Sequence, residues 1–394
     1  MYIFNPENDL ALANFSPHFT APASALKMRR DLAMLPLWYA LHEVLIIAEG
    51  DLNSKLLSEL KEVLPINSSL ISYAQIGDYP HCKVKPWGWN PSIRKELIQL
   101  GINEQLLPSL KDIELLRNYS SRQNAVKLLE ELKLFNSKFC GESFCYTDIN
   151  QLLSYLSRTK GDQVLKMPYS GSGKGIVWLK GAITDKQTDW CRRVIKMQGG
   201  VVVEPALNKV QDFAMEFDMT NSDIQFLGYS LFRSAPSGAY LGNVLLSDEE
   251  IENKLSTYIE RSQLLELKDI LKAKLSNCFP SYRGYFGVDM MVCKTDEAFY
   301  QIQPCVEVNM RMNMGIVAHR INERFVYPKS TGLFSINFYK KEGEAQSNSL
   351  TMQAEHPLVI KDGKIKRGYL SLTPVDEHTQ YTATIAIKEK SRKE

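Results

Sequence analysis

The chain has 394 residues and a formal net charge of +2; 44% of its residues are hydrophobic and 23% are charged. This composition is typical of a globular protein with two or three domains, and the near-neutral charge argues against nucleic-acid binding as the main function. No apolar run is long enough to span a bilayer, and no basic segment precedes an apolar run at the N-terminus. We therefore expect a cytoplasmic protein without nucleic-acid or membrane partners.

The cysteines and histidines form no spacing typical of a zinc site. The seven cysteines are scattered without a CxxC pair, and the six histidines form no HxH or HxxxH cluster. An odd number of isolated cysteines is typical of free thiols in a reducing compartment. We expect free thiols and no zinc.

Segments of strand and helix character alternate over the first hundred residues. Short apolar segments predict strands at residues 2–4, 44–48 and 70–73, and apolar residues at helical spacing predict helices between them. This alternation predicts a small doubly wound, Rossmann-like α/β domain. Because the segment contains no GxGxxG motif, we do not expect it to bind a dinucleotide.

Two features separate this domain from the first glycine-rich segment. The aromatic loop at residues 86–91 is better suited to packing between domains than to stacking a substrate, although stacking stays an alternative. Further along the chain, Ser120 or Ser121 can cap a helix and thereby place Arg122 in its first turn.

A glycine-rich turn joins predicted strands at residues 164–168 and 176–179. The turn consists of Ser170, Gly171, Ser172, Gly173, Lys174 and Gly175. It is not a P-loop, because Pro168 occupies the place of the first motif glycine and a strand, not a helix, follows the lysine. Such a hairpin can still cover phosphates with its backbone N–H groups, while Lys166 would supply a point charge. A mobile surface hairpin is the alternative.

Acidic residues end or interrupt the strands that follow. Glu204 lies in an apolar strand that ends at Pro205, and we expect Asp212 in the loop after it. Asp289 lies inside an apolar strand at residues 284–292, where an unpaired carboxylate would be costly to bury. Asp289 therefore either lies on a solvated face or binds a cation.

A strand around residues 305–311 alternates polar and apolar side chains. The alternation places Glu307, Asn309 and Arg311 on one face. A turn at residues 294–297 would pair this strand antiparallel with the strand of Asp289 and bring the two carboxylates together. Two carboxylates and an amide oxygen suit a hard metal cation. The alternative is a solvated strand face.

Together these segments resemble the ATP-grasp superfamily, which includes D-alanine–D-alanine ligase, glutathione synthetase and biotin carboxylase. The resemblance covers about half of the chain, roughly residues 118–318, and rests on an ordered series of residues rather than on one motif. In chain order the matching residues are Arg122, Lys166, Glu204, Pro205, Ala206, Leu207, Asp212, Asp289, Glu307, Asn309 and Arg311. One departure is Gly287, because many family ligases have Arg two residues before the metal-binding Asp; Arg311, Arg233 or Arg320 could replace it.

The resemblance implies a role for each matching residue. Arg122, Lys166 and residues 170–175 would bind the phosphates of ATP. The adenine and ribose would be bound by Glu204, Pro205, Ala206, Leu207 and Asp212. One or two Mg²⁺ ions, or Mn²⁺, would be held by Asp289, Glu307 and Asn309. Arg311 and Lys166 would be the catalytic residues.

The resemblance also implies a reaction and a domain arrangement. It predicts a ligase that activates a small-molecule or peptide carboxylate as an acyl phosphate for attack by an amine. A kinase of the same fold and a catalytically inactive nucleotide-binding protein are the alternatives. We expect an α/β domain at 1–115, the two lobes of an ATP-grasp fold at 116–200 and 201–340, and a small β-rich extension at 341–394.

Overall fold

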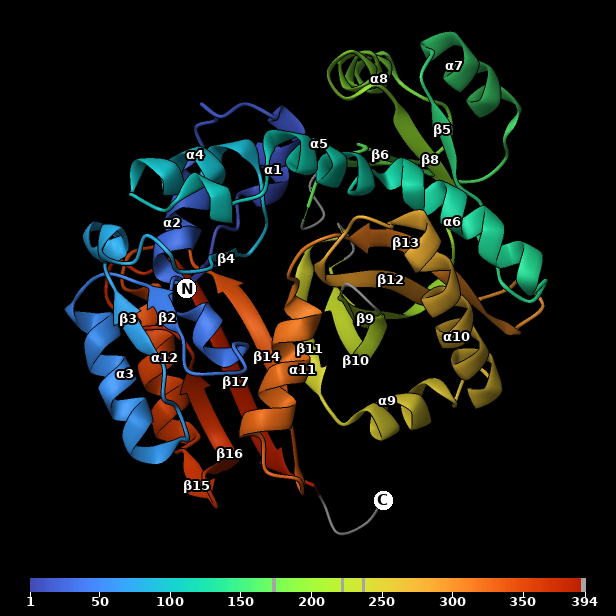
Figure 1. Cartoon of the computed structure of the whole chain (residues 1–394). Helices are drawn as coiled ribbons and strands as arrows, with labels where there is room; N and C mark the ends of the chain where they lie inside the picture. Colours follow the sequence, from blue (N-terminus) through green and yellow to red (C-terminus); the bar gives the residue numbers. More distant parts are fainter. Residues whose placement is uncertain (172–174, 221–222, 236–237, 391–394) are drawn as a thin grey trace. The chain divides into compact units, whose positions relative to one another are not determined.

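The computed structural model describes residues 1–171, 175–220, 223–235 and 238–390 (Figure 1). The chain forms two compact units. The first combines Met1–Glu114, Leu241–Asp248 and Arg311–Glu394, and the second combines Leu115–Tyr240 and Glu249–Met310. The first unit thus contains both ends of the chain. The four domain ranges expected from the sequence divide the chain differently and stay a prediction.

The N-terminal part of the first unit is a four-stranded sheet with the order β3-β2-β1-β4, and its recorded strand pairs are parallel. Its strands are β1 (Tyr2–Ile3), β2 (Leu45–Ile47), β3 (Ser69–Ile71) and β4 (Lys85–Pro86). The helical elements here are α1 (Asn8–Asn14), α2 (Ala23–Asp31), η1 (Leu35–Trp38), α3 (Asp51–Val63), η2 (Tyr73–Asp78), α4 (Pro91–Gln99), η3 (Glu104–Leu106) and α5 (Leu110–Tyr119), which ends in the second unit. The predicted α/β character and its three strands are confirmed.

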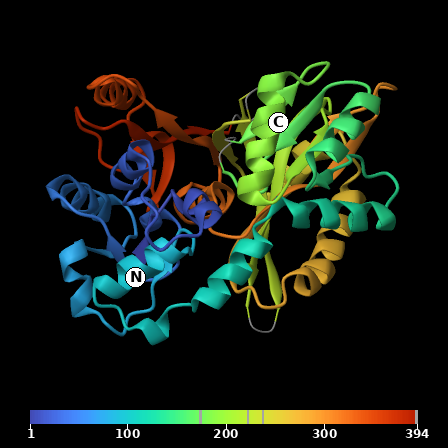
Figure 2. The same cartoon turned by 90° about the horizontal axis from the view of Figure 1, so that it is seen from above.

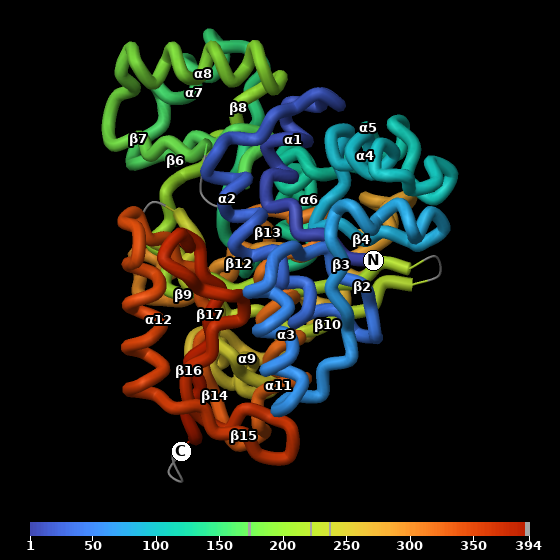
Figure 3. Tube along the Cα trace, turned by 90° about the vertical axis from the view of Figure 1, so that its left-hand side faces the viewer, coloured from blue at the N-terminus to red at the C-terminus, as the bar shows by residue number. Residues whose placement is uncertain are grey.

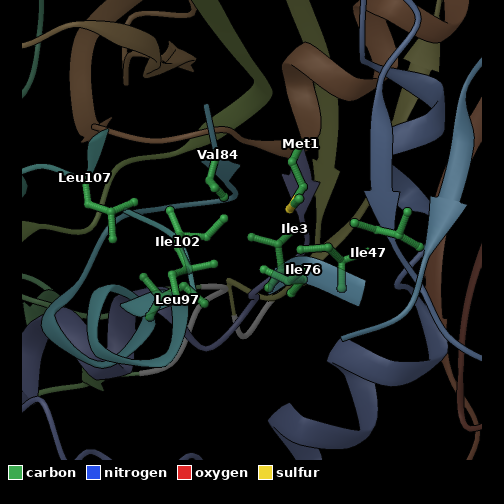
Figure 4. Close-up of a cluster of buried hydrophobic side chains, with 10 residues drawn as sticks. Met1, Ile3, Ile47, Ile76, Val84, Leu97, Ile102 and Leu107 are labelled. Atoms are coloured by element: carbon green, nitrogen blue, oxygen red, sulfur yellow. The ribbon is translucent and has the colours of Figure 1, made fainter. Parts of the chain in front are cut away.

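A cluster of aliphatic side chains forms the core beneath this sheet (Figure 4). Ile3 of β1, Ile47 of β2 and Leu97 of α4 are each at most 1% exposed. The members come from strands and helices at both ends of the segment, so burial of apolar surface holds the predicted Rossmann-like domain together.

The aromatic loop packs inside the first unit. Trp87 is 5% exposed, and its ring meets Phe4 and Tyr39 edge-to-face, with centroid distances of 5.1 and 6.1 Å. The side chain of Asn5 bonds the backbone of Gly88 in both directions. The loop therefore packs rather than standing free, but these partners belong to its own unit, which differs from the expected packing between domains.

The C-terminal part of the first unit is antiparallel. Its neighbouring strands follow the order β11-β14-β17-β16-β15. They are β11 (Tyr240–Leu245), β14 (Ser330–Phe338), β15 (Val359–Lys361), β16 (Lys364–Ser371) and β17 (Tyr381–Glu389), with helices α11 (Met314–Phe325) and α12 (Glu344–Glu355). Trp38 joins this part to the N-terminal segment, because its indole Nε1 donates to the carbonyl of Leu372 at 2.8 Å.

The second unit contains a small sheet with the order β5-β8-β6-β7, all of whose pairs are antiparallel. Its elements are β5 (Phe144–Tyr146), α7 (Ile149–Arg158), β6 (Gln163–Lys166), β7 (Ile176–Leu179), α8 (Asp185–Gln198) and β8 (Val201–Pro205). Helices α7 and α8 lie against this sheet in Figures 1 and 3 and share a core with it. Leu152, Cys191 and Val203 in that core are fully buried.

The remaining strands of the second unit follow the order β13-β12-β9-β10. They are β9 (Lys209–Met219), β10 (Ile224–Ser234), β12 (Gly284–Lys294) and β13 (Tyr300–Asn309), accompanied by α6 (Arg122–Phe135), α9 (Asp248–Leu255) and α10 (Arg261–Cys278). Figure 2 shows the long β9–β10 pair in yellow-green with α10 beside it. Among the described ranges, no helix combines the length and apolarity needed to cross a membrane.

We predict that Trp38→Phe lowers the free energy of unfolding by about 1–3 kcal/mol, because it leaves the buried carbonyl of Leu372 without its donor and removes core volume. Urea denaturation measures the change. The matched control is Trp178→Phe, because Trp178 is 45% exposed and should shift the unfolding midpoint little. Equal effects of the two substitutions would contradict the assigned role of Trp38.

Candidate functional site

The glycine-rich turn closes an antiparallel hairpin. Strands β6 and β7 pair with Lys166 opposite Ile176, and the N–H of Met167 donates to the carbonyl of Gly175 at 2.9 Å. Gly175 has a φ of +73°, and a Cβ there would lie 2.9 Å from the Cβ of Ser170, so this position requires glycine. The predicted site residues Ser172, Gly173 and Lys174 lie outside the described residues.

Arg122 connects this hairpin to strand β13. It is the first residue of α6, whose N-cap is Ser121, and its side chain is 4% exposed. Nη2 donates to both carboxylate oxygens of Glu307 at 2.8 Å. Nη1 donates to Ser170 Oγ at 2.6 Å and to the carbonyl of Met167 at 2.7 Å. One guanidinium therefore fixes the base of the hairpin and a predicted metal ligand together.

Lys166 and Glu204 form a second ion pair in the small sheet. Lys166 Nζ lies 2.5 Å from Glu204 Oε2, and each side chain is only 8% exposed. The hydroxyl of Ser143 donates to the other oxygen of Glu204 at 3.0 Å. Both carboxylate oxygens thus have partners, as burial of an ion pair requires.

The predicted adenine and ribose residues follow Glu204. Strand β8 ends at Pro205, and the N–H of Ala206 already donates to the carbonyl of Asp162 at 2.9 Å. Asp212 accepts from Lys209 Nζ at 2.6 Å and from the hydroxyl of Ser234. Asp212 lies within β9, so the expectation of a loop at this position is wrong; apolar residues that alternate with polar ones continue the strand on both sides.

The three predicted metal ligands lie together on β12 and β13. These strands pair antiparallel with Asp289 directly opposite Glu307, which confirms the pairing expected from the turn between them. Asn309 Nδ2 donates to Asp289 Oδ2 at 3.0 Å. Asp289, Glu307 and Asn309 therefore share one face of the sheet, because register partners and residues two apart point to the same side.

The buried thiol of Cys305 in β13 lies within electrostatic range of both ion pairs and of Asp289. Its thiol is fully buried, and burial raises its pKa well above the ordinary value. The carboxylates of Glu204, Asp289 and Glu307 raise it further, while the ammonium of Lys166 lowers it. Cys305 is two residues before Glu307 in β13, so the charges of both ion pairs act at this end of the strand.

The donor chemistry of this face fits a magnesium ion. Asp289 and Glu307 supply carboxylate oxygens and Asn309 an amide oxygen, which are ligands that Mg²⁺ prefers. Among the described residues, no group of three His, Cys, Asp or Glu side chains is arranged to hold a metal. The candidate metal ligands are therefore two carboxylates and one amide oxygen. One of the carboxylates, Glu307, also forms an ion pair with Arg122.

Glu216 also lies on this face, although the sequence analysis did not single it out. It is 2% exposed and pairs across β9 and β12 with Gly287, which in turn pairs with Asn309. The sequence could have predicted this position, because Asp212, Glu216 and Asp218 recur at even-numbered positions of an otherwise apolar strand and therefore share one face.

Arg311 lies outside this strand, because β13 ends at Asn309. The expectation that Arg311 continues the polar row of β13 is therefore wrong. It belongs to the first unit, where its Nε and Nη2 donate to the two oxygens of Asp9, each at 2.6 Å. Its predicted catalytic role is untested by this arrangement and stays a prediction.

Comparison with known proteins identifies the fold. No protein-family model and no curated protein matches the sequence. Among solved structures, a biotin carboxylase from Campylobacter jejuni in complex with a β-γ-ATP ligand superposes with a TM-score of 0.51 and 10% identity, covering 89% of this chain and 88% of that chain. The chain has the ATP-grasp fold. The predicted fold class is thereby confirmed, and the resemblance to ATP-grasp proteins holds at the level of the fold.

Two further solved structures are similar at lower scores. N5-carboxyaminoimidazole synthetase from Staphylococcus aureus, complexed with ADP, has a TM-score of 0.46 and 13% identity, and the match covers 87% of this chain and 92% of that chain. An L-amino acid ligase from Bacillus licheniformis has a TM-score of 0.46 and 12% identity, with 89% and 94% covered. At such identities the ATP-grasp likeness concerns the fold alone.

We predict that Lys166→Met lowers the free energy of unfolding by about 3–5 kcal/mol, because it leaves the Glu204 carboxylate buried without its cation. Adding Glu204→Gln to Lys166→Met should recover part of that loss, since the stranded charge is then removed. Urea denaturation of the two single variants and the double variant measures the coupling. Strictly additive effects would show that the two side chains do not interact in solution.

Proposed function

We propose that this protein binds ATP with magnesium and uses it to activate a carboxylate for attack by an amine. The observation that carries the proposal is the guanidinium of Arg122: it donates to both oxygens of Glu307, which lies opposite Asp289, and to the base of the glycine-rich hairpin that follows Lys166. Such an arrangement brings together cations that can bind phosphates and oxygen atoms that can bind a metal ion. The ATP-grasp fold supports the same assignment.

Arg122 and Lys166 would contact the phosphates of ATP, and residues 170–175 would cover them. Both cations are held in place by carboxylates before any nucleotide arrives. Holding charged groups in fixed positions reduces the reorganisation that charge stabilisation requires. We assign Glu204, Pro205, Ala206 and Leu207 to the adenine and Asp212 to the ribose hydroxyls.

Asp289, Glu307 and Asn309 would hold one or two magnesium ions, with manganese as an alternative. A bound ion supplies positive charge that neutralises the phosphate oxygens. The shared oxygens of Glu307 position this charge beside the guanidinium of Arg122, so both would act on the same phosphate group. Arg311 follows Asn309 by two residues, and we retain it with Lys166 as a proposed catalytic residue.

The proposed reaction has two steps. A substrate carboxylate attacks the γ-phosphorus of ATP, which gives an acyl phosphate and ADP, and an amine then displaces inorganic phosphate from the acyl carbon. The residues act by positioning and charge neutralisation rather than by covalent chemistry. We expect small-molecule or peptide carboxylates and amines as substrates.

The proposal predicts repeated turnover, and hence continued release of ADP, only when both a carboxylate and an amine are supplied, because the amine is needed to consume the acyl phosphate. Pools of amino acids and small carboxylic acids, tested with a coupled ADP assay, will identify the active pair. In that assay Glu307→Gln should lower ADP release by about 100-fold or more, because the charge of a metal ligand is lost. The Gln amide oxygen can still accept from Arg122, but the buried guanidinium loses its counterion, so circular dichroism must show that the variant is folded before its rate is compared.

Glu297→Gln is the matched control, because Glu297 is exposed in the turn between β12 and β13 and should leave the rate unchanged. A thermal-shift measurement tests binding separately: magnesium with millimolar ATP should raise the unfolding temperature of the unmodified protein. Failure of ATP to stabilise the protein at any magnesium concentration would overturn the proposal.

A further inference from the structure

The side-chain amide of Gln303 in β13 is buried, and its oxygen has no donor. The residue is 1% exposed, and no residue that the structure describes donates to Gln303 Oε1. Leaving a buried polar atom unpaired costs free energy, so native proteins seldom retain one unless water or a ligand binds it. The side chain is also closely packed, because a Cβ added to Gly141 would lie 2.7 Å from Gln303 Cγ and 3.0 Å from Nε2.

Strand pairing places Gln303 on the face that has the predicted metal ligands. Gln303 pairs across β13 and β12 with Met291, and Met291 pairs across β12 and β9 with Asp212. On β12, Met291 follows Asp289 by two residues and therefore shares its face. The partner of Asp289 on β13 is Glu307. Gln303 thus lies in one cross-strand row with the proposed ribose residue, Asp212, and on the same face as the proposed metal ligands.

The segment before β5 connects Gln303 to the proposed adenine residues. Gly141 packs on the side chain of Gln303. Two residues further along the chain, the hydroxyl of Ser143 donates to Glu204 Oε1 at 3.0 Å. The short stretch from 141 to 143 therefore spans from Gln303 to Glu204. Gln303 has neighbours on both sides that we assign to the nucleoside, namely Glu204 through this stretch and Asp212 through the sheet.

The backbone at 204–207 already makes hydrogen bonds within the fold. The N–H of Ala206 donates to the carbonyl of Asp162 at 2.9 Å, and the carbonyl of Leu207 accepts from the N–H of Lys209 at 2.9 Å. These groups are therefore partly committed before a base arrives. A nearby side chain with both a donor and an acceptor can supply the contacts to the base that this backbone does not make.

We propose that Gln303 recognises the adenine base of ATP through both ends of its amide, a role that rests on the proposed function. Nε2 donates to N7 of the base, and Oε1 accepts from the 6-amino group. This is the pairing by which glutamine and asparagine side chains recognise adenine in DNA. Guanine has an acceptor oxygen at position 6 in place of the amino group, so Oε1 would face another acceptor. Gln303 therefore selects ATP over GTP.

The test measures the binding of two nucleotides to the full-length protein by isothermal titration calorimetry with magnesium. The nucleotides are ATP and 7-deaza-ATP, in which a C–H group replaces N7. We expect the unmodified protein to bind 7-deaza-ATP about tenfold more weakly than ATP, because the bond from Gln303 Nε2 is lost and its donor is left unpaired. This comparison needs no variant, so it does not depend on the folding of one.

Gln303→Leu should bind ATP about tenfold more weakly than the unmodified protein and should no longer distinguish the two nucleotides. Without nucleotide it should unfold at about the same temperature as the unmodified protein, since the apolar side chain leaves no buried acceptor unpaired.

Gln163→Leu is the matched control. Gln163 is 3% exposed, and its Oε1 likewise has no donor among the described residues. It lies on the opposite face of β6 from Lys166, because an odd number of positions separates them. Its face includes Leu165, which packs in the core shared with α7 and α8. Gln163→Leu should therefore keep the preference for ATP over 7-deaza-ATP.

Equal binding of the two nucleotides by the unmodified protein would overturn the role of Gln303, as would a preference that survives in Gln303→Leu. Loss of the preference in Gln163→Leu would also overturn it, because the effect would then not be specific to the face of Gln303. Each of these results leaves the proposed function standing. Failure of the unmodified protein to bind ATP would instead overturn the proposed function and this role together.

Discussion

The arrangement of the second unit depends on the guanidinium of Arg122. This group is almost fully buried, and a buried cation is tolerated only when carboxylates and carbonyls satisfy it. Glu307 does so from β13, and Met167 and Ser170 do so from the segment that follows β6. Because these contacts converge on one planar group, the hairpin and the metal face cannot move apart without stranding a charge.

The same pairing couples the binding of an anion to the binding of a cation. An anion that approaches Arg122 alone competes with Glu307 for the same N–H groups, and a cation that approaches Glu307 alone competes with Arg122. When both arrive together, one ion pair is replaced by two, and neither side chain is left uncompensated. The Arg122–Glu307 pair therefore favours binding of a metal ion together with a phosphate over binding of either one alone. The same argument applies to the Lys166–Glu204 pair in the small sheet.

Local signals explain what could be predicted from the sequence. Ser121 caps α6 and so places Arg122, and the turn before β13 is short enough to pair Asp289 with Glu307. Three strands of the N-terminal sheet could be predicted because each coincides with a short apolar segment of the sequence. Asp212 was assigned to a loop although it lies in β9. A polar residue near the end of a strand does not show whether it belongs to the strand or to the loop before it.

Contacts between residues far apart in sequence leave no comparable signal. Asp9 and Arg311 are 302 positions apart, and their contact depends on how α1 and the chain after β13 come together in three dimensions. The β12–β13 pairing likewise contains a bulge, which shifts the register between Asp289 and Met291. A bulge changes which side chains are neighbours without changing the residue pattern that predicts the strand.

The row of residues through Gly287 contains a position at which the sequence departs from the ATP-grasp pattern. Across four neighbouring strands this row consists of Gly228, Glu216, Gly287 and Asn309. None of these side chains is a cation, and one is a buried carboxylate. At the position where the resemblance leads one to expect Arg, this row therefore has glycine. The buried cations Arg122 and Lys166 come instead from α6 and β6, where Glu307 and Glu204 pair with them.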